Sequence, residues 1–147
     1  LEDYIEAREQ RSIKAIFADS GEAVFRQLER DALAEVAAAG DVLIACGGGT
    51  PCFHGNMELM NSLGQTIWLQ ASRERLLCRL KEGRAKRPLI ATMDDAELER
   101  YIDCMTEARK PYYGSAAATF GSDRLENEQE IRETVSRFVK QYMPEKI

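Results

Sequence analysis

Residues 41–50 read Asp-Val-Leu-Ile-Ala-Cys-Gly-Gly-Gly-Thr, a nearly continuous apolar run followed at once by three glycines. Such a run is typical of a strand that is buried on both faces of a parallel sheet. Glycine has no Cβ, so three in succession let the backbone turn sharply and let its amide groups approach a ligand closely. We predict a buried parallel strand over 41–46 that ends in a ligand-binding loop. A tight turn without a ligand is the plainer alternative for the glycines.

The sequence on either side of this run alternates helical patterns with short apolar ones. Further strands are predicted over 65–70 and, more weakly, over 117–121. Because helices alternate with strands, we expect right-handed crossovers and a three-layer α/β/α domain with a parallel sheet. Residues 1–147 are expected to form a single domain, since no linker or repeat divides them. The predicted helices cover residues 1–9, 12–18, 21–39, 57–63, 73–81, 94–109 and 128–142, with Ser12 as an N-cap and Gly40 as a left-handed C-terminal cap.

The composition is that of a globular protein, with 147 residues, 44% hydrophobic residues and a net charge of -5. No apolar run approaches the roughly 20 residues of a membrane-spanning helix, and no secretory signal is visible at the start. The charge is uneven, because residues 73–87 sum to +5 and the remainder to -10. We expect neither a nucleic-acid nor a membrane partner, but a site for one compact anion. A solvated basic helix face is the alternative.

The cysteines are widely spaced and give no metal-binding pattern. No two of them form a C-x-x-C pair, and the chain has one histidine, His54. A zinc site needs tighter ligand spacing and usually more histidine or cysteine. We predict buried free thiols and therefore a reducing, cytoplasmic location. The four cysteines are Cys46, Cys52, Cys78 and Cys104.

A basic side chain interrupts the apolar stripe of the predicted helix over 21–39. Arg26 lies between Phe25 and Leu28 in the sequence. If the guanidinium points inward, it can hold a carboxylate through two hydrogen bonds. The alternative is a solvent-facing Arg26 that pairs with Glu22 or Glu29, four residues before it and three after it.

Two further basic segments suit anion binding. Residues 83–89, Gly-Arg-Ala-Lys-Arg-Pro-Leu, separate two helices with a glycine, three basic residues and a proline. They predict a mobile loop that can close over a phosphate and stabilise its charge, with an exposed loop of no function as the alternative. Arg109 and Lys110 end a helix, where a favourable interaction with the helix dipole is an adequate explanation for either.

Six short motifs follow one another along the chain. They are Glu2-Asp-Tyr-Ile-Glu6, Ser12-Ile-x-x-Ile-Phe17, Gly21-Glu-x-x-Phe25-Arg26-x-x-Glu29, Gly47-Gly48-Gly49, Arg87-Pro88-Leu89 and Arg109-x-Pro111-x-Tyr113. In this order and spacing they make the chain resemble shikimate kinase over residues 1–142. The resemblance implies a P-loop domain like that of nucleoside monophosphate kinases, with a five-stranded parallel sheet. It also implies phosphorylation of the 3-hydroxyl of shikimate by ATP and Mg²⁺, in the pathway to aromatic amino acids.

The resemblance assigns most of the substrate site. Arg26 and Arg109 match the two arginines that hold the substrate carboxylate. Gly47, Gly48 and Gly49 match the loop whose backbone contacts the ring hydroxyls. The apolar walls of the same pocket match Phe17 and Phe25.

The catalytic and ATP-binding residues are implied in the same way. Glu2 matches a carboxylate that binds the substrate hydroxyls and is placed to accept the reacting proton. The family usually has Asp there, and the additional methylene of Glu2 changes the reach of the carboxylate. Arg87, in a lid over about 83–93, matches the arginine that reaches the ATP phosphates and offsets charge on the transferred group. Arg79 lies about where the family places an arginine against the adenine.

One part of the family pattern does not occur in these 147 residues. The family begins with a strand, a glycine-rich loop ending Gly-Lys-Ser/Thr, a helix and a second strand ending in Asp, which hold the ATP phosphates and the magnesium ion. The glycine loop over 47–49 has no such lysine. We expect an N-terminally shortened form of a complete enzyme, without roughly 30 residues. On this interpretation the 147 residues alone are inactive and contain no metal ligands, and the strands over 42–46 and 67–69 lose the neighbour between them.

Two other functions remain open at this stage. One is a relative that binds shikimate without turnover, which the Glu at position 2 and the absent P-loop both fit. The other is a related small-molecule kinase, such as a gluconate kinase, because sugar acids also carry a carboxylate. The resemblance further implies a monomer.

Overall fold

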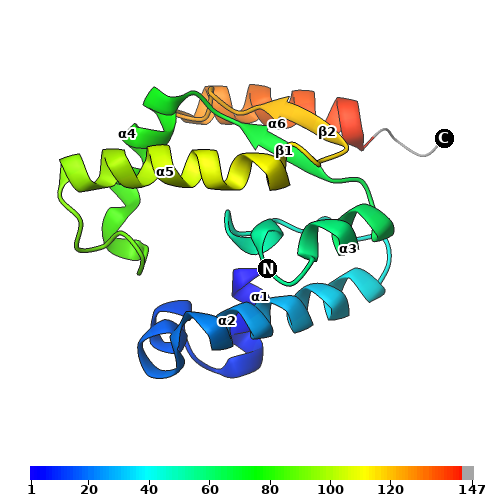
Figure 1. Ribbon diagram of the computed structural model, residues 1–147. Helices are drawn as coiled ribbons and strands as arrows, with labels where there is room; N and C mark the ends of the chain where they lie inside the picture. Colours follow the sequence, from blue (N-terminus) through cyan, green and yellow to red (C-terminus); the bar gives the residue numbers. More distant parts are fainter. Residues whose placement is uncertain (144–147) are drawn as a thin grey trace.

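Helices surround a small parallel sheet in the computed structural model, which describes residues 1–143 (Figure 1). The chain begins with a helical pair, crosses an irregular segment, and then alternates helix and strand to its end. The elements in order are α1 (Glu2–Glu9), α2 (Ile13–Ala38), the 3₁₀ turn η1 (Thr50–Cys52), α3 (Asn56–Leu63), β1 (Ile67–Gln70), α4 (Arg73–Gly83), the 3₁₀ turn η2 (Arg84–Lys86), α5 (Asp95–Tyr113), β2 (Ala118–Gly121) and α6 (Glu128–Tyr142).

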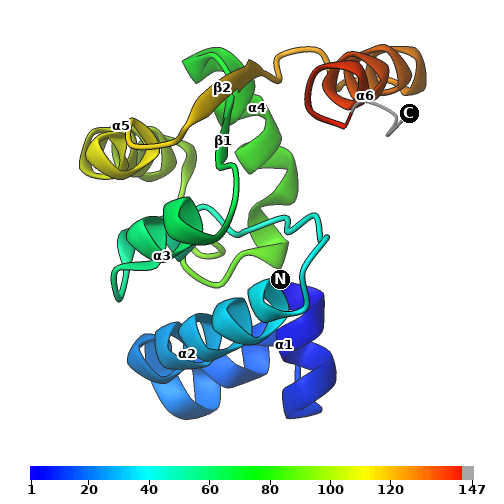
Figure 2. The same ribbon diagram turned by 90° about the vertical axis from the view of Figure 1, so that its right-hand side faces the viewer.

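The sheet lies between two helices, which confirms the predicted layered α/β arrangement. Strands β1 and β2 pair in parallel, from Ile67 opposite Ala118 to Gln70 opposite Gly121. Successive side chains of a strand point to opposite faces, and helices cover both faces (Figure 2). On one face Trp68 packs against Tyr113 of α5, with ring centroids 5.6 Å apart. On the other, three aromatic rings of β2 and α6 pack together, those of Phe120, Phe138 and Tyr142.

The predicted strand over 41–46 is wrong for the described structure. Residues 42–47 form irregular backbone, and the sheet of residues 1–143 consists of β1 and β2 alone. Val42 and Leu43, expected to be buried, are 48% and 70% exposed. A strand exists only where a second strand satisfies its N–H and C=O groups, and here β1 and β2 pair with each other.

The N-terminal helices form their own apolar core. A kink at Gly21, with φ 83° and ψ 171°, divides α2 where the sequence predicted a break between two helices. The Ser12 side chain accepts a hydrogen bond from the Ala15 N–H at 3.1 Å, and Gly40 has φ 69°, so both predicted caps are confirmed. The buried side chains of this core are Ile5, Ile16, Phe25 and Ala32.

A second core joins α4, α5 and the segment predicted to be a mobile loop. Ile90, Leu98 and Ile102 are its buried members. The Arg84 guanidinium donates to the Met93 carbonyl at 2.7 Å and pairs with Asp95. Segment 84–93 is therefore anchored at both ends and by Ile90.

All four cysteines are free, as predicted. Their predicted burial is wrong for Cys46, Cys78 and Cys104, whose residues are exposed, while Cys52 is partly buried. Within residues 1–143, no helix combines the length and the apolar character needed to cross a membrane.

Candidate functional site

Three consecutive glycines face three charged side chains from three different helices. A Cβ added to Gly47 would lie 3.0 Å from Glu2 Oε1, one added to Gly48 2.8 Å from Arg109 Nη1, and one added to Gly49 2.6 Å from Arg26 Nη2. None of these glycines has a positive φ. A side chain at Gly49 would therefore collide with the buried and tightly held Arg26, whereas one at Gly48 would displace the end of the flexible Arg109 side chain. The structure brings together Glu2, Arg26, Arg109 and the glycine loop, all predicted site residues.

Arg26 points inward and is held on several sides. It is 6% exposed, and its Nη1 donates to Glu29 Oε1 at 2.9 Å. Its Nε and Nη2 donate to Glu22 Oε1 at 3.3 and 3.1 Å. The guanidinium carbon also lies 4.2 Å from the centroid of the Phe53 ring and 5.2 Å from that of Phe25. The solvent-facing alternative, in which Arg26 pairs with Glu22 or Glu29, is wrong about exposure, although Arg26 does pair with both glutamates.

Glu29 connects this arginine to the loop. It is 1% exposed, and its second oxygen accepts a hydrogen bond from Thr50 Oγ1 at 2.7 Å. The chain of polar contacts continues, because Asn56 Nδ2 donates to the Thr50 carbonyl at 2.9 Å and Arg30 donates to Asn56 Oδ1 at 3.2 Å. Sequence reasoning gave Glu29 no role at this site. Its spacing of three residues from Arg26 on one helix is the signal that pointed to the pair.

Arg109 and Tyr113 lie one turn apart on α5 and both contact Gly48. The Tyr113 hydroxyl donates to the Gly48 carbonyl. Burial raises the pKa of the Tyr113 phenol, and the nearby Arg109 opposes this rise. Cys52 lies near the same cluster, where burial raises the pKa of its thiol and both Arg109 and Arg26 lower it. These directions follow from two positive groups placed in a partly desolvated site.

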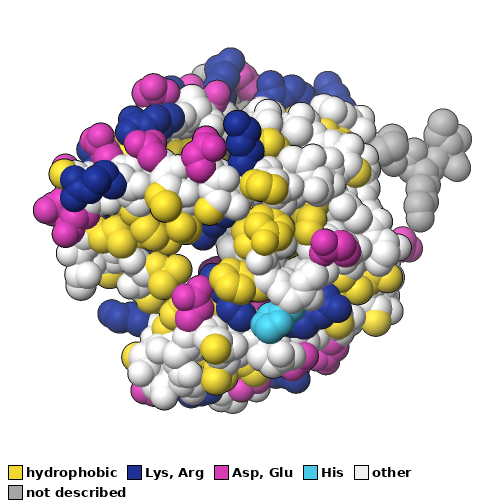
Figure 3. Space-filling view, viewed as in Figure 1, with side chains coloured by type: hydrophobic (Ala, Val, Ile, Leu, Met, Phe, Trp, Pro, Cys, Tyr) yellow, Lys and Arg dark blue, Asp and Glu magenta, His cyan; other side chains and the backbone are white. Residues whose placement is uncertain are grey.

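The predicted apolar walls belong to the N-terminal core beside Arg26. The Phe17 and Phe25 rings pack together with centroids 4.7 Å apart. Phe25 is 3% exposed, so it supports Arg26 from within α2. In the space-filling view the surface is hollowed between α5 and the N-terminal helices, and basic side chains line the edges of the hollow (Figure 3).

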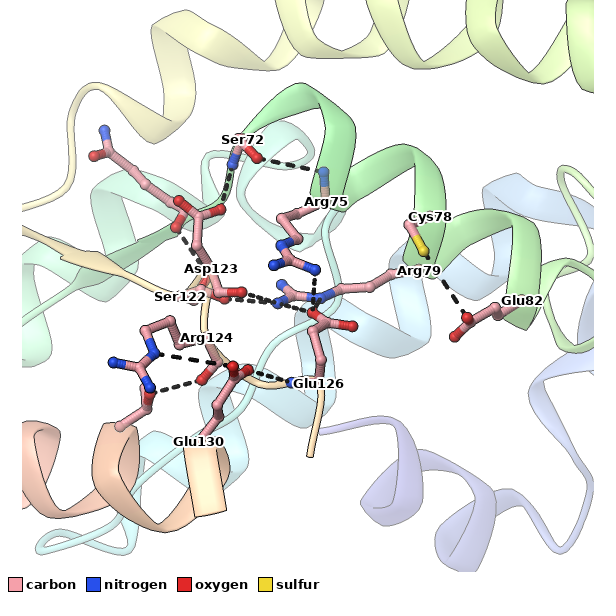
Figure 4. A network of polar contacts seen from close by, with 12 residues as sticks. Ser72, Arg75, Cys78, Arg79, Glu82, Ser122, Asp123, Arg124, Glu126 and Glu130 are labelled. Carbon is pink, nitrogen blue, oxygen red and sulfur yellow. Dashed lines mark hydrogen bonds and ion pairs between the residues drawn. The ribbon is translucent and has the colours of Figure 1, made fainter. Parts of the chain in front are cut away.

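Arg79 lies in a separate polar network, which joins α4 to the segment after β2 (Figure 4). Its Nε and Nη2 donate to Glu126 Oε1 at 3.0 and 2.7 Å. Nη2 also donates to the carbonyls of Ser122 and Asp123 at 2.9 and 3.1 Å. The Asp123 side chain in turn accepts the Ser72 N–H at 2.7 Å. Arg79 therefore fixes segment 122–126 against α4.

Arg87 is exposed, and the structure does not bring it to the glycine loop. Its Nη1 donates to the Gly83 carbonyl at 3.3 Å. Within residues 1–143, no hydrogen bond or ion pair connects it with the cluster around Gly47–Gly49. The two predicted catalytic residues, Glu2 and Arg87, therefore belong to different parts of this structure.

Metal-binding side chains do not gather in clusters in the described part of the chain. Among residues 1–143, no three side chains of the His, Cys, Asp or Glu type come close enough together to hold a metal ion.

Comparisons with known proteins give one consistent result. A family model described as shikimate kinase matches residues 1–141. A shikimate kinase of Parabacteroides distasonis is 39% identical over 140 residues, which cover 95% of this chain and 81% of that protein. The crystal structure of a shikimate kinase from Bacteroides thetaiotaomicron has a TM-score of 0.86 at 38% identity, covering 95% of this chain and 80% of that chain.

A more distant solved structure shares the fold. The shikimate kinase from Acinetobacter baumannii, determined in complex with shikimate, is 22% identical to this chain. The superposition has a TM-score of 0.78 and covers 97% of this chain and 78% of that one.

Proposed function

Because the chain belongs to the shikimate kinase family and has a P-loop kinase fold, we propose that it binds shikimate at the Gly47–Gly49 loop. Shikimate bound there would be phosphorylated on its 3-hydroxyl by ATP. The observation that carries the proposal is the convergence of Glu2, Arg109 and Arg26 on three adjacent glycines. These groups have the chemistry needed to bind a cyclic acid that carries several hydroxyls. Cations bind its carboxylate, while a carboxylate and backbone amides bind its hydroxyls.

The charge balance of the cluster fits a single carboxylate. Arg26 is already paired with Glu22 and Glu29. Among residues 1–143, by contrast, no ion pair joins Arg109 to a carboxylate. A bound carboxylate would thus be attracted chiefly by Arg109 and oriented by Arg26, whose planar group suits two-point contact.

The loop backbone offers donors for the ring hydroxyls. Within residues 1–143, none of the N–H groups of Gly47, Gly48 and Gly49 donates a hydrogen bond to the protein. The glycine carbonyls, in contrast, are in use, because Gly47 accepts from the Thr50 N–H at 3.2 Å and Gly49 from the Cys52 N–H at 3.0 Å. A loop with fixed carbonyls and free donors supports close approach of a polar ligand.

We assign Glu2 to the reacting hydroxyl. Its exposed carboxylate lies over Gly47, at the opposite end of the glycine loop from Arg26. There it would accept a hydrogen bond from a ring hydroxyl and hold the proton that leaves as the phosphoryl group is transferred. The side chain is one methylene longer than the family's usual Asp, and this length sets the distance to the hydroxyl.

The ATP side of the proposal rests on Arg87, Arg79 and a lid over about 83–93. Arg87 would offset the charge of the transferred phosphoryl group. Arg79, with the edges of its guanidinium bonded to segment 122–126, has flat faces suited to stacking on an adenine. ATP and Mg²⁺ are the expected cosubstrate and cofactor. Because the 147 residues contain no Gly-Lys-Ser/Thr motif to hold the ATP phosphates, we expect no phosphoryl transfer from them alone.

We further propose that the protein is a cytoplasmic monomer that acts on a small molecule. The four free cysteines support a reducing compartment.

A coupled assay of the full-length gene product with ATP tests the function. We expect turnover with shikimate and none with gluconate. A folded protein that binds shikimate without turnover would be the non-catalytic relative, and turnover of gluconate alone would make it a different small-molecule kinase. Either result overturns the proposed reaction.

Replacing Arg109 with Ala tests the assigned binding mode. Arg109 is a cation that pairs with no carboxylate among residues 1–143, so it is available to bind the carboxylate of shikimate. Its removal takes away a charge-assisted contact, and we expect the affinity for shikimate to fall roughly 100-fold. The affinity for ATP should change less than about twofold. Isothermal titration with each ligand measures both values, and Lys110→Ala, exposed on the same helix, is the matched control. Equal losses for shikimate and ATP would contradict the role of Arg109.

A further inference from the structure

The peptide between Gly48 and Gly49 joins two residues that lack a Cβ. Glycine populates both signs of φ, so a Gly-Gly peptide can rotate as a unit and exchange the directions of its C=O and N–H. The peptide group itself is planar, which means that any contact holding the Gly48 carbonyl also fixes the Gly49 N–H on the other side. A ligand that uses this N–H therefore depends on whatever holds the carbonyl.

Tyr113 holds that carbonyl. Its hydroxyl donates to the Gly48 oxygen across 65 positions of sequence. A Cβ added to Gly48 would lie 3.2 Å from the Tyr113 hydroxyl oxygen, so the loop and the phenol are in direct contact. Within residues 1–143 no other hydrogen bond to the Gly48 carbonyl is present, whereas the carbonyls of Gly47 and Gly49 accept bonds from within the loop.

The ring of Tyr113 is itself fixed in place. It packs against Trp68 of β1 with ring centroids 5.6 Å apart. Tyr113 also lies one turn after Arg109, so α5 presents the carboxylate-binding cation and the phenol to the same loop residue. Burial raises the pKa of the phenol, so it stays protonated and able to donate at neutral pH.

The geometry points to Tyr113 as a positioning residue for substrate binding, one that fixes the Gly48–Gly49 peptide and so presents the Gly49 N–H to shikimate. This inference rests on the proposed function, because it assumes that the loop amides bind the substrate. Tyr113 does not touch the reacting atoms in this role. It acts through the loop and lowers the cost of ordering that loop on binding.

Replacement of Tyr113 by Phe in the full-length protein tests this role, with Tyr112→Phe as the control. The Phe ring keeps the packing on Trp68 and removes the hydroxyl alone, while the neighbouring Tyr112 is 41% exposed. We expect the KM for shikimate to rise about five- to twentyfold for Tyr113→Phe, with the KM for ATP and the melting temperature unchanged. Tyr112→Phe should match the unsubstituted protein in all three.

A second readout needs no turnover. Amide chemical shifts of ¹⁵N-labelled protein should move for Gly48 and Gly49 in Tyr113→Phe, and not in Tyr112→Phe. Unchanged glycine shifts, a shikimate KM within twofold, or a parallel rise in both KM values would each overturn the positioning role. If the unsubstituted protein fails to phosphorylate shikimate, the proposed function fails, and the glycine shifts still decide whether Tyr113 orders the loop.

Discussion

Glu29 is a fully buried carboxylate whose two oxygens each accept a hydrogen bond, one from Arg26 and one from Thr50. Glu29→Gln leaves the buried Arg26 with Glu22 as its only charged partner among the described residues, and the Glu22 side chain is 43% exposed. Removing one partner of a buried pair typically costs about 3 kcal/mol, whereas an exposed partner contributes under about 1 kcal/mol. We expect a loss of about 2–3 kcal/mol in the free energy of unfolding for Glu29→Gln.

Urea denaturation measures this difference, with Glu22→Gln as the control on the same guanidinium. Equal losses for the two variants would mean that Glu29 contributes no more than a surface ion pair. The expected contrast arises from burial, because the two glutamates are otherwise the same chemical group on the same helix.

The phenol of Tyr113 predicts a pH effect in the alkaline range. Its pKa in the folded protein is raised above the ordinary 10.0 by burial, so the unfolded chain loses this proton first as the pH rises. The stability that this group contributes is therefore present below about pH 10 and is lost as the pH passes through the raised value. Between about pH 9 and pH 11, Tyr113→Phe should lose less stability than Tyr112→Phe. Thermal melts across this range measure the slopes, and parallel slopes would contradict the expectation.

At the scale of residues, the sequence predicted the charged groups of the cluster better than the groups that hold them. Arg26 and the glycines stand out because a cation in an apolar stripe and a triple glycine are unusual, whereas Arg109 was assigned through the resemblance to shikimate kinase. Tyr113 belongs to the motif Arg109-x-Pro111-x-Tyr113, but the sequence assigned it no function in the site. A side chain that acts on backbone far away in the sequence leaves no local pattern.

Gly21 places a kink inside helix α2. Gly21 has φ 83° and ψ 171°, and a Cβ there would meet nothing within 4 Å. The cost of Gly21→Ala is therefore one of backbone conformation rather than of a clash, about 1–3 kcal/mol. Gly64→Ala is a suitable control, since Gly64 is extended at φ -170° and equally free of neighbours. Thermal denaturation should separate the two variants, and equal melting temperatures would show that the kink tolerates a side chain.

The sequence predicted the limits of the helices more closely than it predicted the strands. The helix limits agreed closely, because caps such as Ser12 and the capping box of Asp94 and Glu97 act within one turn. The helix ending in Tyr113 was predicted to stop at Arg109, and it continues through Pro111. The run over 41–46 has every local property of a strand, yet a strand also needs a partner, which no local pattern contains.

At the scale of the whole molecule, segment 84–93 is anchored on α4 and α5 while Arg87 remains exposed. We expect Arg87→Ala to lower kcat about 10- to 100-fold in the full-length protein, because its contact would form mainly in the transition state. The KM for shikimate should stay within about twofold. Steady-state kinetics measure both, with the neighbouring exposed Lys86→Ala as control. Unchanged turnover would remove Arg87 from the catalytic machinery.

The register of the sheet has a consequence for the time course of folding. Ile67 and Ala118 are partners about fifty residues apart, whereas α1 with α2, and α4 with α5, meet as near neighbours in the chain. Closing the longer loop costs more chain entropy, so the helical pairs should assemble before β1 finds β2. Trp68, the single tryptophan, lies on β1 against Tyr113. We therefore expect its fluorescence to report the last step of refolding, separately from an earlier helical signal in circular dichroism.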